Sequence, residues 1–198
     1  MRHLARLLPA SVLVLTPTLA LAHPGFGPTA GFGHGFFHPL SGIDHLLVMV
    51  AVGVFAARKG GRALWILPTS FVALMAVGGA LGMAGIGLPF VETAIALSVV
   101  ALGAAVALGI DMPTAAAAAL VGMFALFHGH VHATEMPETA AGLAYGAGFM
   151  AATAMLHLLG IGLGLGFGRA RGRIAERAQQ LGGGAMALVG LVLMAGAL

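Results

Sequence analysis

Residues 33–47 read GHGFFHPLSGIDHLL, so three histidines and one aspartate stand at the head of an apolar run that continues to about residue 57. A run of this length can cross a lipid bilayer as a helix. Ionisable side chains inside such a span are costly, so each of them marks a candidate functional site. The stretch therefore predicts a membrane helix that carries chemistry.

The composition of the whole chain supports a membrane protein. Of its 198 residues, 60% are hydrophobic and 8% are charged, and the mean hydropathy is +1.03. A soluble domain is about 45–50% apolar and about 25% charged, and a disordered chain has low hydrophobicity. Both classes are therefore excluded. The formal net charge is only +3, and we read the few basic residues as signals of membrane orientation, with no nucleic-acid partner.

Histidine is unusually frequent in this apolar chain. There are nine histidines and no cysteine, which excludes disulfides, thiolate metal sites and iron–sulfur clusters. The functional question is therefore what the histidines do.

The N-terminus has the pattern of a secretory signal peptide. Arg2 and Arg6 precede an apolar stretch over 7–19 that two prolines interrupt, and an A-x-A cleavage site follows at 20–22. The alternative is a first transmembrane helix, which is weaker because the apolar run is short and broken. We expect cleavage after Ala22, so that the mature chain begins at His23.

The remaining chain, 23–198, is expected to be one all-α transmembrane domain with six spans. Its basic residues all fall in the first and fifth connections, which the positive-inside rule assigns to the cytoplasm. Both mature termini would then be periplasmic, and the chain would lie in the bacterial inner membrane. The windows are 35–57, 63–85, 89–110, 113–133, 139–167 and 180–198, and the basic residues are Arg58, Lys59, Arg62, Arg169, Arg171, Arg173 and Arg177.

Glycines at four-residue spacing are typical of helices that approach each other closely in lipid. We prefer this packing interpretation to a role in gating. The rows are Gly78 with Gly82, Gly142 with Gly146, and Gly160 with Gly164 and Gly168.

The first histidine group allows two geometries. His38 and His45 are seven residues apart, so in a regular helix they share a face but lie about 10 Å apart. That separation is too large for one ion. Either Pro39 and Gly42 loosen the backbone and bring the two imidazoles together, or they are successive stations on one path.

Two further residues belong to this group. Asp44 points about 120° away from the shared face, so it could pair with a histidine of another helix or fix the tautomer of a ligand. His34 extends the face of His38 by one turn.

The second group lies in FHGHVHATE at residues 127–135. In a helix, His128 and His132 have the i, i+4 spacing that suits chelation, and Glu135 continues their face. In an extended segment, His128, His130 and His132 would instead point one way. Both conformations gather imidazoles and predict a site for a divalent transition metal.

The expected orientation places both groups towards the outer face and His157 deeper, as an importer would need. Imidazole and carboxylate ligands suit nickel, cobalt, zinc or iron. Copper(I) is a further alternative, because it prefers thioether ligands. Met49 follows His45 by one turn, and the chain has 11 methionines. After cleavage, His23 would also carry a free α-amino group that can chelate a metal.

The chain resembles the HupE/UreJ family of nickel/cobalt permeases. The resemblance rests on the residue blocks 23–25, 33–47, 127–135 and 153–157, in the family's order. The first block is similar to the His-x-x-x-x-Asp-His signature of the larger nickel/cobalt transporter families, with one more intervening residue. Ala133 stands where we expect glycine in the commoner form of the family's motif. This difference affects the shape of the backbone more than the ligands, and it leaves the identity of the metal open.

The resemblance implies a signal peptide, six helices and secondary transport of nickel or cobalt for hydrogenase, urease or cobalamin. It also implies that His38, Asp44 and His45 are metal-path residues. The residues beside them would be His128, His130, His132 and Glu135.

We therefore expect a permease and no enzyme, with Ni²⁺ or Co²⁺ as cargo, no prosthetic group, and the lipid bilayer as surroundings. The only lysine is Lys59, so the chain has no phosphate-binding loop.

The alternatives are a permease for copper, zinc or iron, and an accessory protein that binds metal for a hydrogenase-type or urease-type enzyme without transporting it. A b-type haem carrier is disfavoured because the histidines cluster at one edge. The sequence is also compatible with a homo-oligomer.

Overall fold

Seven α-helices make up the part of the chain that the computed structural model describes, which is residues 31–134, 136, 140–169 and 173–197. No strand occurs among these residues, which confirms the all-α prediction. The helices are α1 (Phe32–Ser41), α2 (Ile43–Lys59), α3 (Ala63–Met83), α4 (Val91–Ala107), α5 (Thr114–Thr134), α6 (Ala140–Arg169) and α7 (Arg173–Ala197).

The helices have the lengths and apolar composition of a membrane protein. Within the described residues, α3, α5, α6 and α7 are each long and apolar enough to cross a bilayer, and the bent pair α1 and α2 would be a fifth span. Helix α4 has 17 residues and is shorter than these. The expected signal peptide and His23 lie outside the described residues.

The first apolar window is not one regular helix. Helices α1 and α2 meet at an angle of 87°, and Gly42 between them is extended, with φ −94° and ψ 121°. Pro39 has no N–H to donate within α1, and the Ser41 hydroxyl donates to the carbonyl of His38 at 2.6 Å near the helix end. Of the two geometries open for this window, the loosened backbone is therefore confirmed.

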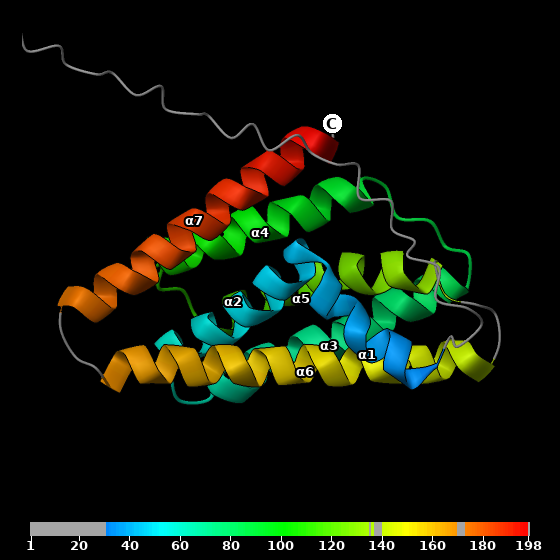
Figure 1. Cartoon of the computed structure of the whole chain (residues 1–198), viewed down its shortest axis with the longest axis horizontal. Helices are drawn as coiled ribbons and strands as arrows, with labels where there is room; N and C mark the ends of the chain where they lie inside the picture. The colour runs from blue at the N-terminus through cyan, green and yellow to red at the C-terminus, as the bar shows by residue number, and fades with distance from the viewer. Residues whose placement is uncertain (1–30, 135, 137–139, 170–172, 198) are drawn as a thin grey trace, which may run out of the picture.

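Close helix pairs build the rest of the molecule. Helix α3 packs along α5, α2 along α6, and α4 along α7, and the last pair forms one edge of the bundle (Figure 1). A Cβ atom added to Gly78 would lie 2.0 Å from the carbonyl oxygen of Leu126, and one on Gly160 would lie 2.1 Å from that of Val50. These glycines therefore let the backbones touch, which confirms the packing interpretation for both positions. By contrast, nothing lies within 4 Å of the corresponding point on Gly168.

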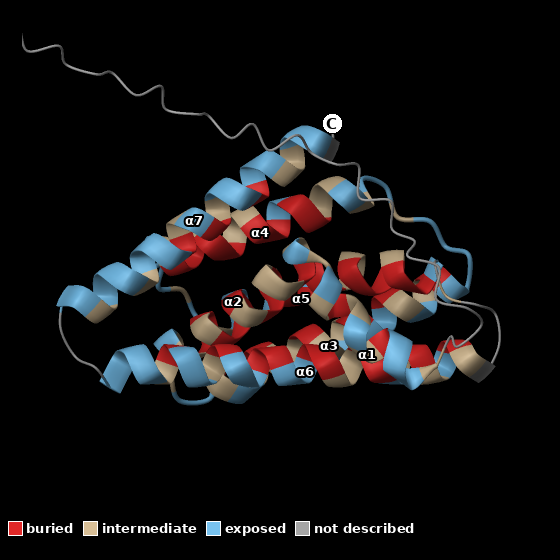
Figure 2. Ribbon diagram, viewed as in Figure 1, coloured by how far each residue is buried: buried red, intermediate tan, exposed pale blue. Residues whose placement is uncertain are grey.

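Buried side chains of α2, α3, α4, α5 and α6 form the core. Met49, Phe55, Leu67 and Phe71 are among its largest fully buried side chains. Figure 2 shows most of α7 exposed, whereas buried residues concentrate on the helices at the centre. The described histidines that were predicted to bind metal are carried by these central helices and by α1.

Candidate functional site

Four imidazoles from three helices converge at the break between α1 and α2. The ring centroids of His45 and His132 are 4.4 Å apart, those of His38 and His132 4.8 Å, and those of His45 and His128 5.0 Å. The bend at Gly42 brings the rings of His38 and His45 to 6.4 Å. We call these four residues the histidine cluster.

Asp44 orients His45. Its Oδ1 accepts a hydrogen bond from Nδ1 of His45 at 2.7 Å and one from the backbone N–H of His45 at 2.9 Å. A neutral His45 therefore keeps its proton on Nδ1, and its Nε2 lone pair faces Nε2 of His132, with which it is in contact. Of the two roles considered for Asp44, the structure shows the fixing of a tautomer, within the same helix.

Gly42 makes room for this pair. A Cβ atom at position 42 would lie 2.9 Å from both Asp44 Oδ1 and His45 Nδ1. A side chain at position 42 would therefore crowd the Asp44–His45 hydrogen bond.

His128 has a defined tautomer as well. The Ser98 hydroxyl donates to the carbonyl of Ile95 at 2.6 Å, so its oxygen is left to accept from Nε2 of His128 at 3.1 Å. The proton of a neutral His128 then lies on Nε2. Its Nδ1 carries a lone pair and has no hydrogen-bond partner among the described residues. Sequence reasoning missed Ser98 because nothing in the sequence links α4 to α5.

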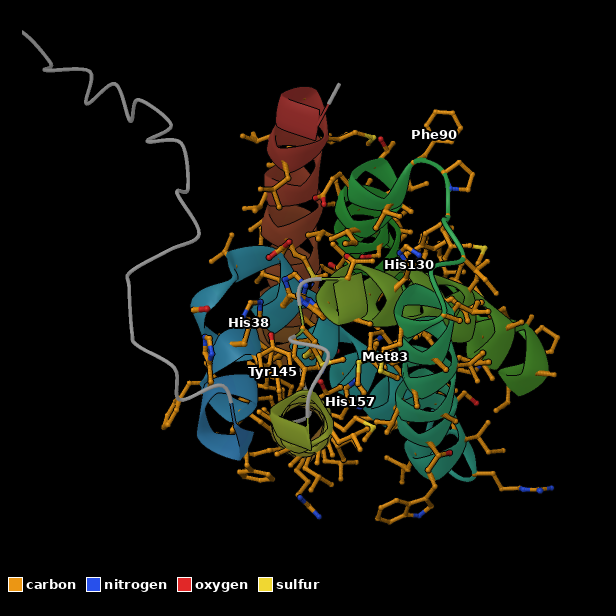
Figure 3. All side chains as sticks on the ribbon, turned by 90° about the vertical axis from the view of Figure 1, so that its right-hand side faces the viewer. His38, Met83, Phe90, His130, Tyr145 and His157 are labelled. Carbon is orange, nitrogen blue, oxygen red and sulfur yellow. The ribbon has the colours of Figure 1, made fainter. Side chains whose placement is uncertain are left out.

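An aromatic wall on α6 encloses the cluster. The ring of Phe149 lies 4.4 Å from that of His132, and the ring of Tyr145 lies 5.8 Å from that of His38. Figure 3 shows His38 and Tyr145 extending towards each other from α1 and α6. Neither aromatic was singled out in the sequence. Their i, i+4 spacing with Thr153 and His157 is the signal that could have found them.

His130 does not join the cluster. Because α5 is helical, His130 lies about 200° around the axis from His128. Its Nε2 is 2.8 Å from the carbonyl oxygen of Ile86, and Figure 3 shows it on the side of Phe90, away from His38. The helical alternative for this segment is therefore confirmed, and the extended one is wrong.

The other predicted residues have different positions. His34 is exposed, with its ring 6.4 Å from that of His38 and 5.6 Å from that of Tyr145. Glu135 and His23 lie outside the described residues.

His157 is buried inside the bundle. It is 1% exposed, and neither ring nitrogen has a hydrogen-bond partner among the described residues. The ring of Phe71 is 5.1 Å from that of His157 and 5.8 Å from that of His128, so it lies between the two histidines.

The donors form a row. Among the described residues, no three histidine, aspartate or glutamate side chains surround one point in metal-binding geometry. The imidazoles instead meet in successive pairs, from His38 and His132 through His45 to His128. Such a row offers a cation several neighbouring positions.

The fold and the site define a polytopic helical membrane protein with a buried histidine cluster at a broken helix. Comparison with known proteins makes this specific: the family model described as "HupE / UreJ protein" matches residues 11–193, and the chain belongs to this family. Protein HupE of Rhizobium leguminosarum bv. viciae is 52% identical over 183 residues, which cover 91% of this chain and 92% of that protein. No solved structure matches the chain.

The family places the chain in a functional class. HupE/UreJ proteins are associated with nickel or cobalt uptake or with accessory functions for hydrogenase and urease, and they are not known as enzymes. The resemblance inferred from the sequence motifs is therefore confirmed.

Proposed function

We propose that the chain is a secondary permease that carries Ni²⁺ or Co²⁺ into the cytoplasm. The observation that carries this proposal is the convergence of four imidazoles at the break between α1 and α2. Secondary transporters place their substrate and ion sites at such discontinuous helices. Non-helical backbone at membrane depth is tolerated only where protein buries it or where it lines a cavity.

The electrostatics of the helix ends suits a cation. His38 and His132 lie in the last turns of α1 and α5, where the helix dipole contributes partial negative charge. Asp44 lies in the first turn of α2, and its carboxylate offsets the positive end of that helix. The ion would shed water onto the imidazoles and then pass inward towards His157.

The proposed topology has six spans, with α1 and α2 together as the first and α4 as a short third. Contacts at one end of the bundle support a common cytoplasmic side. Arg58 donates to the carbonyl of Val106 at 3.0 Å and to Gln179 at 3.3 Å, and Lys59 pairs with Asp111 at 3.0 Å. These contacts join the ends of α2 and α4 to the starts of α5 and α7. The proposal includes cleavage after Ala22 and periplasmic termini in a bacterial inner membrane.

The proposal is tested by uptake of radioactive nickel and cobalt into cells that express the chain, compared with cells that carry an empty vector. We expect accumulation that rises with time. Competition by unlabelled zinc, iron and copper then ranks the cargo metals. No accumulation above the control, with the chain present in the membrane, would contradict the proposal and favour an accessory protein that binds metal without transporting it.

Removal of the Asp44 carboxylate is expected to reduce uptake strongly. Loss of a residue that orients a metal-binding histidine typically costs about 10–100-fold in metal affinity or activity. We therefore expect Asp44→Ala to lower the uptake rate by about 10–100-fold at equal membrane abundance. Asp44→Asn keeps an oxygen that can accept from His45. Its uptake rate should therefore lie between those of the unmodified chain and of Asp44→Ala. Equal rates for all three proteins would show that the 2.7 Å hydrogen bond has no role in transport.

Acidification is expected to lower uptake. A neutral imidazole binds metal and a protonated one does not. Uptake measured at a fixed membrane potential should therefore fall once the external solution is acidic enough to protonate the imidazoles of the histidine cluster. A rate that kept rising in acid would instead indicate a proton-driven step.

A further inference from the structure

Two thioethers and one hydroxyl meet inward of the histidine cluster. The Thr153 hydroxyl lies 3.3 Å from the sulfur of Met49 and 3.9 Å from that of Met75. Met49 and Thr153 are 0% exposed, and Met75 is 3% exposed. Three different helices, α2, α3 and α6, thus direct sulfur and oxygen atoms to one buried point.

His157 adds an imidazole beside this group. It follows Thr153 by one turn on the same face of α6, which is a rise of about 6 Å. Both of its ring nitrogens are buried without a hydrogen-bond partner among the described residues. A buried polar group in this condition is costly unless something else satisfies it. A ligand shared by Thr153 and His157 would supply that partner.

The group is connected to the histidine cluster. Met49 follows His45 by one turn on α2, and Thr153 follows Phe149 by one turn on α6. Met75 and His132 line the same cavity, of about 190 Å³, between α3, α5 and α6. A cation at the cluster therefore has the thioethers as its next donors on the way to His157.

We propose that Met49, Met75, Thr153 and His157 form an inner metal site that receives the cation from the histidine cluster. This inference rests on the proposed transport function and adds a second station to the path. All four donors are uncharged when His157 is neutral, so the site leaves the charge of the ion uncompensated. It would hold an ion briefly and release it inward.

The donors define which cations the inner site accepts. Thioethers favour soft metals, imidazole suits nickel, cobalt, zinc and copper, and hard ions such as Mg²⁺ and Mn²⁺ prefer carboxylate and water oxygens. The site would therefore pass soft and borderline transition metals and disfavour the hard divalent ions that are abundant in cells. Ag⁺ is a suitable probe because it is soft and does not change its oxidation state on binding.

The test uses the double variant Met49→Leu/Met75→Leu, which keeps the side-chain volume and removes both sulfurs. The matched control is Met155→Leu, whose position on α6 lies between Thr153 and His157 but is 42% exposed. Purified full-length proteins are loaded with Ag⁺, and X-ray absorption at the silver edge reports sulfur ligands. Cells that express each protein are assayed for nickel and cobalt uptake.

We expect silver–sulfur ligation in the unmodified chain and in the control, and its loss in the double variant. Nickel and cobalt uptake by the double variant should fall at least about 10-fold, as for other residues that support a metal site. The single variants Met49→Leu and Met75→Leu should each lose part of the sulfur signal, which keeps the test decisive should the double variant fail to fold.

The inner site is overturned if the double variant transports at the normal rate and retains its silver ligation, because the methionines then serve only in packing. Failure of the proposed function gives a different result. In that case the unmodified chain would show silver–sulfur ligation but no uptake of nickel or cobalt.

Discussion

Replacing His45 and His132 together by alanine is expected to abolish metal uptake. Their Nε2 atoms meet where α2 faces α5, and their ring centroids are 4.4 Å apart. Because loss of a single supporting residue costs about 10–100-fold, loss of two ligands should lower the rate by more than about 100-fold. The measurement is the initial rate of nickel and cobalt uptake, normalised to the amount of protein in the membrane.

His130 offers a matched control on the same helix. It is two residues before His132, but its Nε2 lies 2.8 Å from the carbonyl oxygen of Ile86. His130→Gln keeps a donor for that carbonyl, and residue 130 faces away from the histidine cluster, so uptake should stay within about twofold. A loss equal to that of the double variant would contradict the assignment of the path to the histidine cluster.

Replacing Gly160 by alanine is expected to destabilise the protein and reduce transport. The added Cβ atom would lie 2.1 Å from the carbonyl oxygen of Val50 and 3.0 Å from Cα of Gly53. Backbone atoms cannot rotate away, so α2 and α6 must separate, at a cost of about 1–3 kcal/mol. The separation also moves the backbone of His157, whose carbonyl oxygen would lie 2.2 Å from a Cβ on Gly53. Thermal unfolding in detergent measures the first effect and metal uptake the second.

Gly162 is the control for this substitution. It lies two residues further along α6, and nothing lies within 4 Å of the point where its Cβ would be. Alanine is a better helix former than glycine, so Gly162→Ala should be at least as stable as the unmodified chain. If the two alanine variants unfolded at the same temperature, the close contact between α2 and α6 would contribute nothing to stability.

The sequence predicted the helical class, and it marked His38, His45, His128 and His132 as candidates, because hydrophobic runs and costly polar residues are visible in one dimension. Pro39 and Gly42 made a break in the first span one of two alternatives, and the structure shows the break. The family followed from the order and spacing of the motifs. The six-span count and the cleavage after Ala22 stay predictions.

Side-chain partners from different helices could not be predicted in the same way. The rotation of each helix about its axis decides whether His130 or His132 faces His45, and tertiary packing sets that rotation. The same holds for Ser98 with His128 and for Thr153 with the two methionines. Asp44 differs, because its partner His45 is its neighbour in the chain, and tautomer fixing was one of the two roles that the sequence suggested for it.

The central claim is that the chain itself carries the metal. The most direct measurement uses purified protein in lipid vesicles that hold a metal indicator, with an inside-negative potential imposed across the bilayer. We predict that nickel or cobalt enters these vesicles faster as the potential grows, and that vesicles with the His45→Ala/His132→Ala variant show no entry above protein-free vesicles. The permease function would be contradicted if the unmodified chain inserts and binds metal, but metal enters no faster than into protein-free vesicles.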